Sequence, residues 1–351
     1  MAYQVETESR SCAAGIDGTV YVLAESSDAC RAEVWPTLGF NCFSWRLRRG
    51  ETRLELLYAA PDLFNSPVPT RSGIPILFPF PNRIRDGEFA WREKAYRLPR
   101  NDPAGKNAIH GFACRRPWRV VETGAGPASA WVTAEFRSSV DADESRLLWP
   151  GNYRITVTYR LRHDSLRVEA LVQNVGPELL PFGLGYHPYF HVPMIAGATE
   201  RDCRIEVPAR RYWELAANLP TGTCMPVDAI RDLRQPRPLA ELKLDDVLTN
   251  FPDNDPSPEA LLRRGRISQP AQGIAVELWT SPAFRELVVF NPPHRQAICL
   301  EPYTCTTDAI NLHQRGVDAG LLLLEPGGTW FGAVEICVVQ TNEPGLAERP
   351  A

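Results

Sequence analysis

The stretch from residue 152 to 174, NYRITVTYRLRHDSLRVEALVQN, alternates apolar and polar side chains with a period of two. Apolar side chains occupy every second position from Tyr153 to Leu161, and arginines and threonines lie between them. Residues 163–165, His-Asp-Ser, predict a turn, after which the alternation resumes from Leu166 to Val172. This pattern is typical of an antiparallel hairpin that buries one face and exposes the other. The chain is therefore expected to build antiparallel sheets.

The rest of the chain favours the same fold class. Thirty-two prolines break it into short apolar runs, and helical patterns are expected only at 257–264 and for one turn after Asp308. The segment 232–258, rich in Pro, Asp and Leu, predicts a long excursion over the surface. The sequence thus predicts an all-β sandwich or barrel formed by one domain over residues 1–351 with short flexible termini. Further strands are expected at 18–23, 38–48, 52–58, 129–137, 274–280, 285–291, 297–300 and 330–338.

Composition narrows the class of protein. The net charge is -4 and the sequence pI is about 5.9, so no nucleic-acid partner and no anionic membrane surface is expected. No run reaches the 18 apolar residues of a membrane helix, and the first fifteen residues lack a secretory pattern. Nine cysteines form no C-x-x-C pair, which favours reduced thiols and a cytoplasmic location.

Polar side chains that carry chemistry interrupt apolar strand ends in four stretches. Loops at strand ends are where such groups converge on a rigid scaffold, so the four stretches together predict one pocket. Its candidates are Asn82 and Arg83 in 73–87, His110 in 107–118, His187 in GLGYHPYF (183–190), and Glu301 with Asp308 in 297–312.

Taken singly, each candidate has other interpretations. A lone histidine at a strand end is more often structural, and Arg83 could pair with Asp86. His187 and His191 have the spacing of a helical zinc pair, but Pro188 and the strand context disfavour that geometry. A glycosidase would need two carboxylates, which Glu301 could form with Asp245, Asp246 or Asp308. The chain contains no G-x-S-x-G elbow, P-loop or dinucleotide fingerprint.

Together the four stretches resemble the motifs of the aldose 1-epimerases, or mutarotases, in the order in which that family has them. The matching residues are Asn82-Arg83-Ile84 with Gly87, His110-Gly111, His187-Pro188-Tyr189-Phe190, and Glu301-Pro302 followed by 308–311. A weaker fifth match, LDDVLTN (244–250), favours Asp245 over Asp246 as a sugar ligand. The resemblance implies a large antiparallel β-sandwich, the galactose mutarotase-like supersandwich.

The resemblance also implies an activity and a role for each residue. The family interconverts the α and β anomers of an aldohexose without a metal or organic cofactor. For this chain, the expected partner is a small sugar substrate, and the expected state is a monomer or homodimer. By resemblance, Glu301 is the general base on the C1 hydroxyl and His187 the general acid on the ring oxygen. A histidine pKa near 6.5 suits that acid, and desolvation should raise the pKa of the glutamate. His110 and Arg83 would hold the ring oxygen and nearby hydroxyls, while Asn82 and Asp245 orient the sugar.

Two departures from the family pattern leave alternatives open. Phe112 stands where a second glycine is common, and His191 stands where an asparagine often follows. One alternative is an epimerase for hexose 6-phosphates, with Arg71, Arg85, Arg115 or Arg116 on the phosphate. Another is a non-catalytic carbohydrate-binding protein on the same fold. The aromatic candidates for stacking on a sugar are Phe80, Phe112, Trp118, Tyr189 and Phe290.

Overall fold

The chain is described by a computed structural model that covers residues 2–142, 145–252, 257 and 260–341. Its strands form three large sheets, and every pairing between the strands named below is antiparallel. The five-stranded sheet has the order β1 (Tyr3–Ser9), β2 (Thr19–Glu25), β3 (Cys30–Trp35), β4 (Asn41–Arg49) and β5 (Thr52–Glu55). The nine-stranded sheet has the order β11 (Arg119–Ala125), β12 (Ala130–Arg137), β13 (Tyr153–Leu161), β14 (Ser165–Asn174), β28 (Thr329–Gln340), β24 (Ile274–Thr280), β23 (Leu262–Gln269), β18 (Arg204–Glu206) and β21 (Arg237–Pro238).

The third sheet carries most of the candidate site. Its eight strands are β20 (Leu219–Pro226), β19 (Arg211–Ala216), β22 (Asp245–Thr249), β25 (Glu286–Phe290), β26 (Ala297–Tyr303), β16 (Gly185–Tyr186) and β6 (Ile76–Leu77), with β17 (Tyr189–His191) also paired to β26. Three strand pairs complete the described sheets: β7 (Arg83–Ile84) with β10 (Ala108–Ile109), β8 (Glu88–Trp91) with β9 (Lys94–Arg97), and β15 (Leu180–Phe182) with β27 (Leu322–Leu324).

The helices are short. The α-helices of the described residues are α1 (Ser138–Asp141), α2 (Ser145–Leu148) and α3 (Ala309–Gln314). Single 3-10 turns occur at Pro36–Leu38, Pro69–Arg71, Arg85–Gly87, Ala113–Arg115, Glu200–Asp202, Leu239–Glu241 and Pro270–Gln272. The predicted all-β fold and the predicted turn after Asp308 are thus confirmed.

The hairpin predicted from the alternation is confirmed as β13 and β14, which pair from Tyr153↔Asn174 to Leu161↔Leu166. The five apolar side chains of β13 at alternate positions are fully buried, and those between them are half-buried. The other expected strands also form, with shifted ends. The largest shifts are three residues at one end: β4 begins at Asn41, β5 ends at Glu55 and β26 ends at Tyr303.

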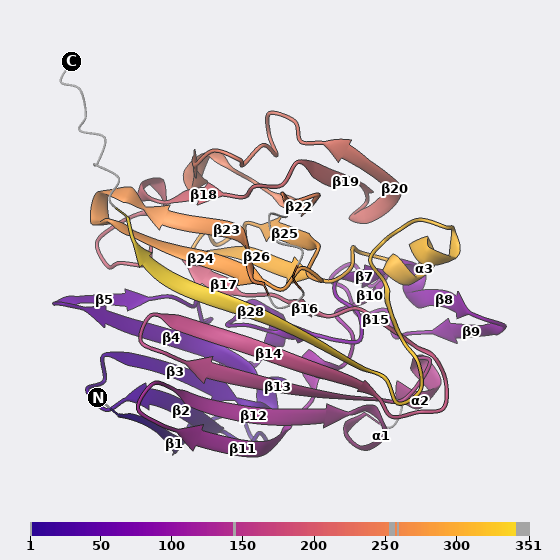
Figure 1. Ribbon diagram of the computed structural model, residues 1–351, viewed down its shortest axis with the longest axis horizontal. Coiled ribbons are helices and arrows are strands. Elements are labelled where there is room, and N and C mark those ends of the chain that lie inside the picture. The colour runs from indigo at the N-terminus through magenta and orange to yellow at the C-terminus, as the bar shows by residue number, and fades with distance from the viewer. Residues whose placement is uncertain (1, 143–144, 253–256, 258–259, 342–351) are drawn as a thin grey trace.

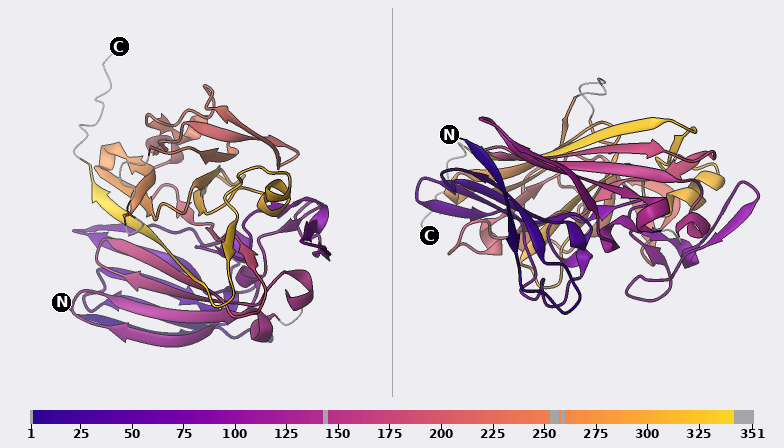
Figure 2. Two further views of the ribbon diagram at one scale, coloured as in Figure 1. Left: turned by 45° about the vertical axis from the view of Figure 1, so that its right-hand side comes forward. Right: turned by 90° about the horizontal axis from the view of Figure 1, so that it is seen from below.

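The sheets pack as layers. The end of the nine-stranded sheet that contains β11–β14 covers the five-stranded sheet, as the view from below in Figure 2 shows. One large apolar cluster fills the interior and includes Trp45 of β4 and Val157 of β13. On the other side, β23 packs on the eight-stranded sheet, where a Cβ added to Gly265 would lie 2.9 Å from Leu300 Cδ1 of β26. Leu300 therefore faces β23, and its neighbour Glu301 faces the opposite way. Figure 1 shows β23 and β26 above β1–β4.

Two predictions about the segment between 232 and 264 are wrong. The helix expected at 257–264 is not formed over 262–264, where β23 begins and pairs with β24; residues 258–259 lie outside the described chain. Sheet pairing overrides the local helical pattern there. The expected surface excursion instead contains β21 and β22, and its leucines are buried because they pack into the core: Leu233, Leu239, Leu242 and Leu244. Residues 253–256 and 258, also part of that prediction, lie outside the described chain.

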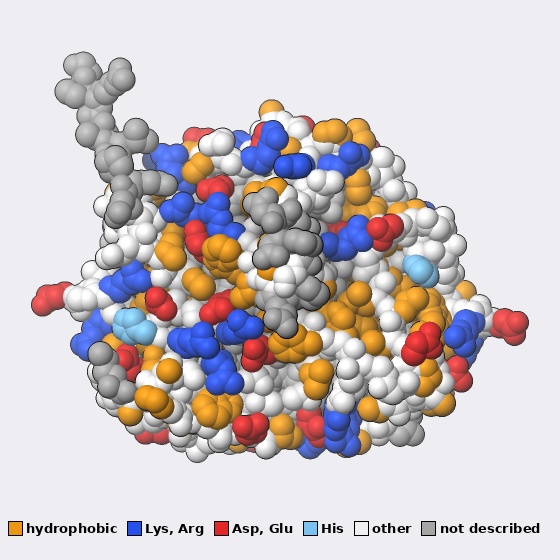
Figure 3. Space-filling view, in the orientation of Figure 1, with side chains coloured by type: hydrophobic (Ala, Val, Ile, Leu, Met, Phe, Trp, Pro, Cys, Tyr) orange, Lys and Arg blue, Asp and Glu red, His pale blue; other side chains and the backbone are white. Residues whose placement is uncertain are grey.

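The predictions from composition can be compared with the described residues. All nine cysteines are free, as expected for reduced thiols. None of the described helices has the length and apolar character needed to cross a membrane. Acidic and basic side chains are interspersed over the face drawn in Figure 3.

Candidate active site

Strand β26 supplies the centre of the candidate site. Successive side chains of a strand point to opposite faces, so Cys299, Glu301 and Tyr303 share the face that turns away from β23. On the neighbouring strand β25, Val288 lies opposite Glu301 and Phe290 lies opposite Cys299. Val288 and Phe290 line the same cavity as Glu301 and give it an apolar wall.

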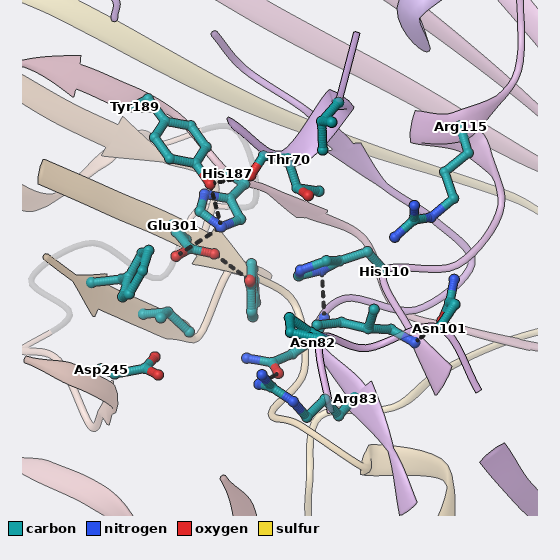
Figure 4. Close-up of a pocket in the computed structure, with 16 residues that line it drawn as sticks. Thr70, Asn82, Arg83, Asn101, His110, Arg115, His187, Tyr189, Asp245 and Glu301 are labelled. Carbon is teal, nitrogen blue, oxygen red and sulfur yellow. Dashed lines mark hydrogen bonds and ion pairs between the residues drawn. The ribbon is translucent and has the colours of Figure 1, made fainter. Parts of the chain in front are cut away.

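His187 lies across from Glu301 because of the strand register. Gly185 of β16 pairs with Tyr303, and Tyr189 of β17 pairs with Cys299. His187 is midway between them, at the point where the ladder is interrupted before Pro188. Its Nε2 is 3.4 Å from Glu301 Oε1, and the two side chains are buried (Figure 4).

The two glycines of the GLGYHPYF stretch allow close approach. A Cβ at Gly183 would lie 2.3 Å from Cys305 Sγ, and one at Gly185 would lie 2.5 Å from Tyr303 Cδ1. Any larger residue at Gly185 would therefore displace the Tyr303 ring or the backbone. The glycines thus fix the approach of β16 to β26.

The opposite wall of the cavity comes from the ends of β7 and β10. Asn82 and His110 both have left-handed backbone conformations, with φ of 53° and 65°. The His110 amide donates to the Asn82 carbonyl at 2.9 Å, and the Asn82 amide donates to His110 Nδ1 at 3.2 Å. Because Nδ1 accepts this hydrogen bond, the neutral ring carries its proton on Nε2. Gly111 is required next to it, since an added Cβ would lie 2.2 Å from the Phe78 carbonyl oxygen.

Arg83 is held by partners other than Asp86. Its Nε lies 3.6 Å from Asp102 Oδ2, and its Nη1 donates to Asn82 Oδ1 at 3.1 Å. The Asp102 carboxylate in turn accepts the amides of Lys106 and Asn107. These bonds fix the guanidinium at the edge of the cavity, where Figure 4 shows it beside Asn82.

Asp245 and Asp246 have different surroundings. Asp246 accepts a hydrogen bond from Arg231 Nε at 2.6 Å and does not line the cavity. Asp245, at the start of β22 and opposite Phe290, lines the cavity on the side of Glu301. Burial raises the pKa of Asp245, and Arg83 opposes that shift. Of the two, Asp245 is the one in position to contact a ligand.

These residues surround a cavity of about 360 Å³, which lies within the range of small-molecule sites. All six predicted site residues line it: Asn82, Arg83, His110, His187, Asp245 and Glu301. Asp308 does not; it lies at the start of α3 and accepts the Arg85 amide at 3.0 Å. Of the aromatic candidates, Tyr189 and Phe290 line the cavity, whereas Phe80, Phe112 and Trp118 do not.

Burial opposes charge on both members of the central pair. It lowers the pKa of His187 to about 3. It also raises the pKa of Glu301 well above its usual range, an effect that the Tyr303 hydrogen bond partly offsets. The expectation of a raised glutamate pKa is confirmed, whereas the expected histidine pKa near 6.5 is wrong because burial desolvates the imidazole. Burial therefore favours the neutral forms of both groups, a protonated carboxyl group and an uncharged imidazole.

His110 is also neutral. Burial lowers its pKa well below the usual value, and the positive charges of His187, Arg115 and Arg83 would add to that effect. With Nδ1 accepting from Asn82, His110 offers a fixed Nε2–H donor to the cavity. The rings of His110 and His187 lie 5.7 Å apart, so a ligand can contact both.

One group of side chains has the composition of a metal site. His187, Cys299 and Glu301 offer ligand atoms within 4.8 Å of one another. His191 is not part of this group, and its Nδ1 lies 2.7 Å from the Pro193 carbonyl oxygen. The helical zinc pair of His187 and His191 is therefore not formed.

Tyr303 was not among the sequence candidates, although it is fully buried and its hydroxyl donates to Glu301 Oε2. Its position two residues after Glu301 on a strand was the available signal. Thr70, in the 3-10 turn Pro69–Arg71, and Asn101, in an irregular segment, also line the cavity and belong to no motif.

Comparisons with known proteins agree with this geometry. The family described as Aldose 1-epimerase matches residues 26–337. Two uncharacterized proteins of Escherichia coli K12 are each 28% identical to the chain: YihR over 72% of this chain and 74% of its own length, and YphB over 72% and 78%.

Solved structures with low sequence identity share the fold. A galactose mutarotase-like protein from Clostridium acetobutylicum superposes with a TM-score of 0.85 at 23% identity, covering 97% of this chain and 99% of its own. A galactose 1-epimerase from Lactobacillus acidophilus superposes with a TM-score of 0.74 at 16% identity, with the same coverage. The fold is thus of the galactose mutarotase-like type, and since the family match extends over most of the sequence, the chain belongs to the aldose 1-epimerase family.

Proposed function

We propose that this protein is an aldose 1-epimerase that interconverts the α and β anomers of an aldohexose. The observation that carries the proposal is the buried pair of His187 Nε2 and Glu301 Oε1, 3.4 Å apart in a cavity of suitable size. Ring opening needs a proton on the ring oxygen and the loss of a proton from the C1 hydroxyl. A matched acid and base supply both, and each typically contributes about 10²–10⁴-fold.

The reaction is written with Glu301 as the base and His187 as the acid. As the bond between C1 and the ring oxygen breaks, the ring oxygen takes a proton from the His187 imidazolium. The C1 hydroxyl gives its proton to the Glu301 carboxylate, and C1 becomes an aldehyde carbon. Rotation about C1–C2 and the reverse proton transfers close the ring on the other face. No proton is gained or lost overall.

The pKa shifts of the pair favour this cycle. The reactive state, with a carboxylate and an imidazolium, contains the same number of protons as the neutral pair that burial favours. When the sugar is bound, its polar groups would stabilise the carboxylate and the imidazolium, as water stabilises exposed charges. Ring opening then returns the pair to the neutral state that burial favours. The buried environment thus stabilises the open-chain intermediate relative to the closed ring.

The remaining residues would hold the sugar. His110, whose Nε2–H is fixed by the bond at Nδ1, is suited to donate to the ring oxygen or an adjacent hydroxyl. Arg83 and Asn82 are preorganised by their own hydrogen bond and would orient hydroxyls on the same side. Asp245 would accept from a hydroxyl at the opposite end, and Tyr189 and Phe290 supply apolar surface.

Saturation-exchange NMR on equilibrated sugars tests the function. Glucose, galactose and glucose 6-phosphate are compared with and without protein, at a pH where spontaneous exchange is slow. We expect faster α–β exchange for at least one sugar. Tight binding without faster exchange would instead support a non-catalytic carbohydrate-binding protein, a function for which a matched acid and base are unnecessary.

One observation favours a phosphorylated substrate as a second candidate. Arg115 is exposed at the cavity and has no acidic partner among the described residues, whereas Arg71, Arg85 and Arg116 do not line the cavity. Arg115 is therefore the candidate ligand for a phosphate on C6. If Arg115 binds this phosphate, Arg115→Gln should lower kcat/KM for glucose 6-phosphate at least about tenfold, because a charge-assisted contact is lost. The kcat/KM for glucose should not change. Arg116→Gln is the matched control; equal effects of Arg115→Gln on both sugars would argue against a phosphate site.

A further inference from the structure

The hydroxyl of Tyr303 is directed at the carboxylate that the proposed reaction requires. It donates to Glu301 Oε2, whereas the other carboxylate oxygen, Oε1, faces His187 Nε2 at 3.4 Å. Tyr303 and Glu301 are two residues apart on β26, so their side chains lie on the same face of the strand. Glu301 thus has one oxygen toward the proposed acid and the other occupied by a phenol.

The surrounding backbone is shaped for this ring. Gly185 lies directly opposite Tyr303 in the β16–β26 pairing, and the ring covers it so closely that an added Cβ would be 2.5 Å from Cδ1. Leu77 of β6 pairs with Gly185 on its other side and belongs to the same buried cluster as Tyr303. The ring therefore has little freedom to move, and its hydroxyl position is set by the sheet.

The phenol acts only as a donor in this position. Burial raises the pKa of Tyr303 well above its usual value, and the neighbouring Glu301 raises it further. The hydroxyl consequently keeps its proton over the whole pH range in which the protein would be assayed. A fixed donor stabilises the ionised carboxylate more than the protonated one, and it also orients the oxygen that must accept the C1 proton.

We infer that Tyr303 is a positioning residue for the proposed reaction: it holds the Glu301 carboxylate with Oε1 toward His187 and the cavity and stabilises its ionised form. The inference rests on the proposed function and adds to it a third group acting through the base. Loss of the hydroxyl should leave more of the shared proton on Glu301, so that less of the enzyme is in the reactive charged state. The ring itself should still pack.

The test is Tyr303→Phe, which keeps the ring and removes the donor. We expect kcat for anomer exchange to fall about 10- to 100-fold with KM largely unchanged, as for a lost hydrogen bond to a charged group. The pH at which Glu301 titrates should rise by about one to two units. In the plot of kcat against pH, the transition with the same midpoint should shift by the same amount. Glu301 is followed by its carboxylic C=O infrared band, assigned by its loss in Glu301→Gln.

The matched control is Tyr186→Phe. Tyr186 is a buried tyrosine on the adjoining strand, and its hydroxyl has no hydrogen-bond partner within the described part of the chain. This variant should leave kcat and the Glu301 titration unchanged. A second variant, Gly185→Ala, keeps the Tyr303 hydroxyl but displaces its ring, and should move the Glu301 titration in the same direction as Tyr303→Phe.

The outcomes separate this inference from the proposed function. An unshifted Glu301 titration in folded Tyr303→Phe would overturn the inference, whatever the activity of the wild type. Equal effects of Tyr303→Phe and Tyr186→Phe would also overturn it, because they would indicate a general packing effect. If the Glu301 titration shifts in Tyr303→Phe but the wild type does not accelerate anomer exchange, the positioning role of Tyr303 stands and the proposed function is contradicted.

Discussion

The β13–β14 hairpin and the β16/β17–β26 pairing are both antiparallel, yet they use their inward faces differently. In the hairpin, the ladder is continuous from Tyr153↔Asn174 to Leu161↔Leu166, and the inward residues of β13 are apolar. In the second pairing, the ladder is interrupted between β16 and β17, and the face carries His187 and Glu301. The sheet thus accepts two titratable groups, fully desolvated, where apolar side chains would be more stable. Under the proposed function, the first pairing serves stability and the second serves catalysis.

The largest expected effect is on the rate of anomer exchange, which should depend on the β16/β17–β26 pairing and not on the hairpin. Glu301→Gln and His187→Asn should each lower the rate of anomer exchange by about 10²–10⁴-fold, because each removes the proposed base or acid. Saturation-exchange NMR measures the rate, and circular dichroism confirms folding. Matched substitutions in the hairpin, Glu169→Gln on its half-buried face and His163→Gln in its turn, should leave the rate unchanged. Near-normal exchange in either site variant would mean that the reactive pair has been misassigned.

A smaller effect is expected on the unfolding free energy, which should depend more on the hairpin core than on the Glu301 carboxylate. Val157→Ala removes two methyl groups from a fully buried position of β13 and should cost about 1–3 kcal/mol of unfolding free energy. Activity per folded molecule should stay at the wild-type level. Glu301→Gln should lower the unfolding free energy less than Val157→Ala, because a charge on the buried Glu301 carboxylate does not stabilise the fold. Chemical denaturation compares them, and a greater loss in Glu301→Gln would show that the carboxylate has a structural role as well.

The smallest effect is a change in how stability depends on pH. Between about pH 4.5 and 6.5, the ordinary pKa values of Glu and His, the unfolded pair carries one proton, on the histidine. In the folded pair, the raised pKa of Glu301 and the lowered pKa of His187 change proton binding in opposite directions, so their contributions to the slope oppose each other in this window. In Glu301→Gln only the lowered pKa of His187 remains, and stability should rise with pH by up to about 1.4 kcal/mol per unit.

In His187→Asn, stability should change with pH in the opposite direction. Only the raised pKa of Glu301 remains, so the folded state binds the extra proton and stability should fall as pH rises above 4.5. Unfolding free energies of each variant are compared with the wild type at each pH, which cancels the contributions of other groups. Slopes of the same sign in the two variants would contradict a shared proton.

Much of the fold was predictable because it follows from local periodicity. The alternation in 152–174 identified β13 and β14 because a period of two requires only neighbouring residues. The helix expected at 257–264 failed because the pairing of β23 with β24 is a tertiary interaction that local propensity does not contain. The prediction that 232–258 runs over the surface is wrong for the same reason, because the partners of its buried leucines lie in distant strands.

The candidate site was predictable in its residues but not in its geometry. Motif order brought Asn82, His110, His187 and Glu301 together in one list, and the structure brings them to one cavity. That His187 lies opposite Glu301 depends on the register of β16, β17 and β26, which no local pattern gives. The histidine pKa was mispredicted for a related reason, since the extent of desolvation depends on packing from several strands. Tyr303 was accessible to the period-two argument and was overlooked.

The most direct test of the central claim is a double-mutant cycle on the exchange rate, with wild type, Glu301→Gln, His187→Asn and the double variant measured on the sugar that exchanges fastest. The account holds that the two residues form one unit that carries a single proton between sugar and protein. It predicts that the double variant loses about as much activity as either single variant, because removing one member already disables the pair. Losses that multiply in the double variant would contradict the account, since they would mean that Glu301 and His187 act independently.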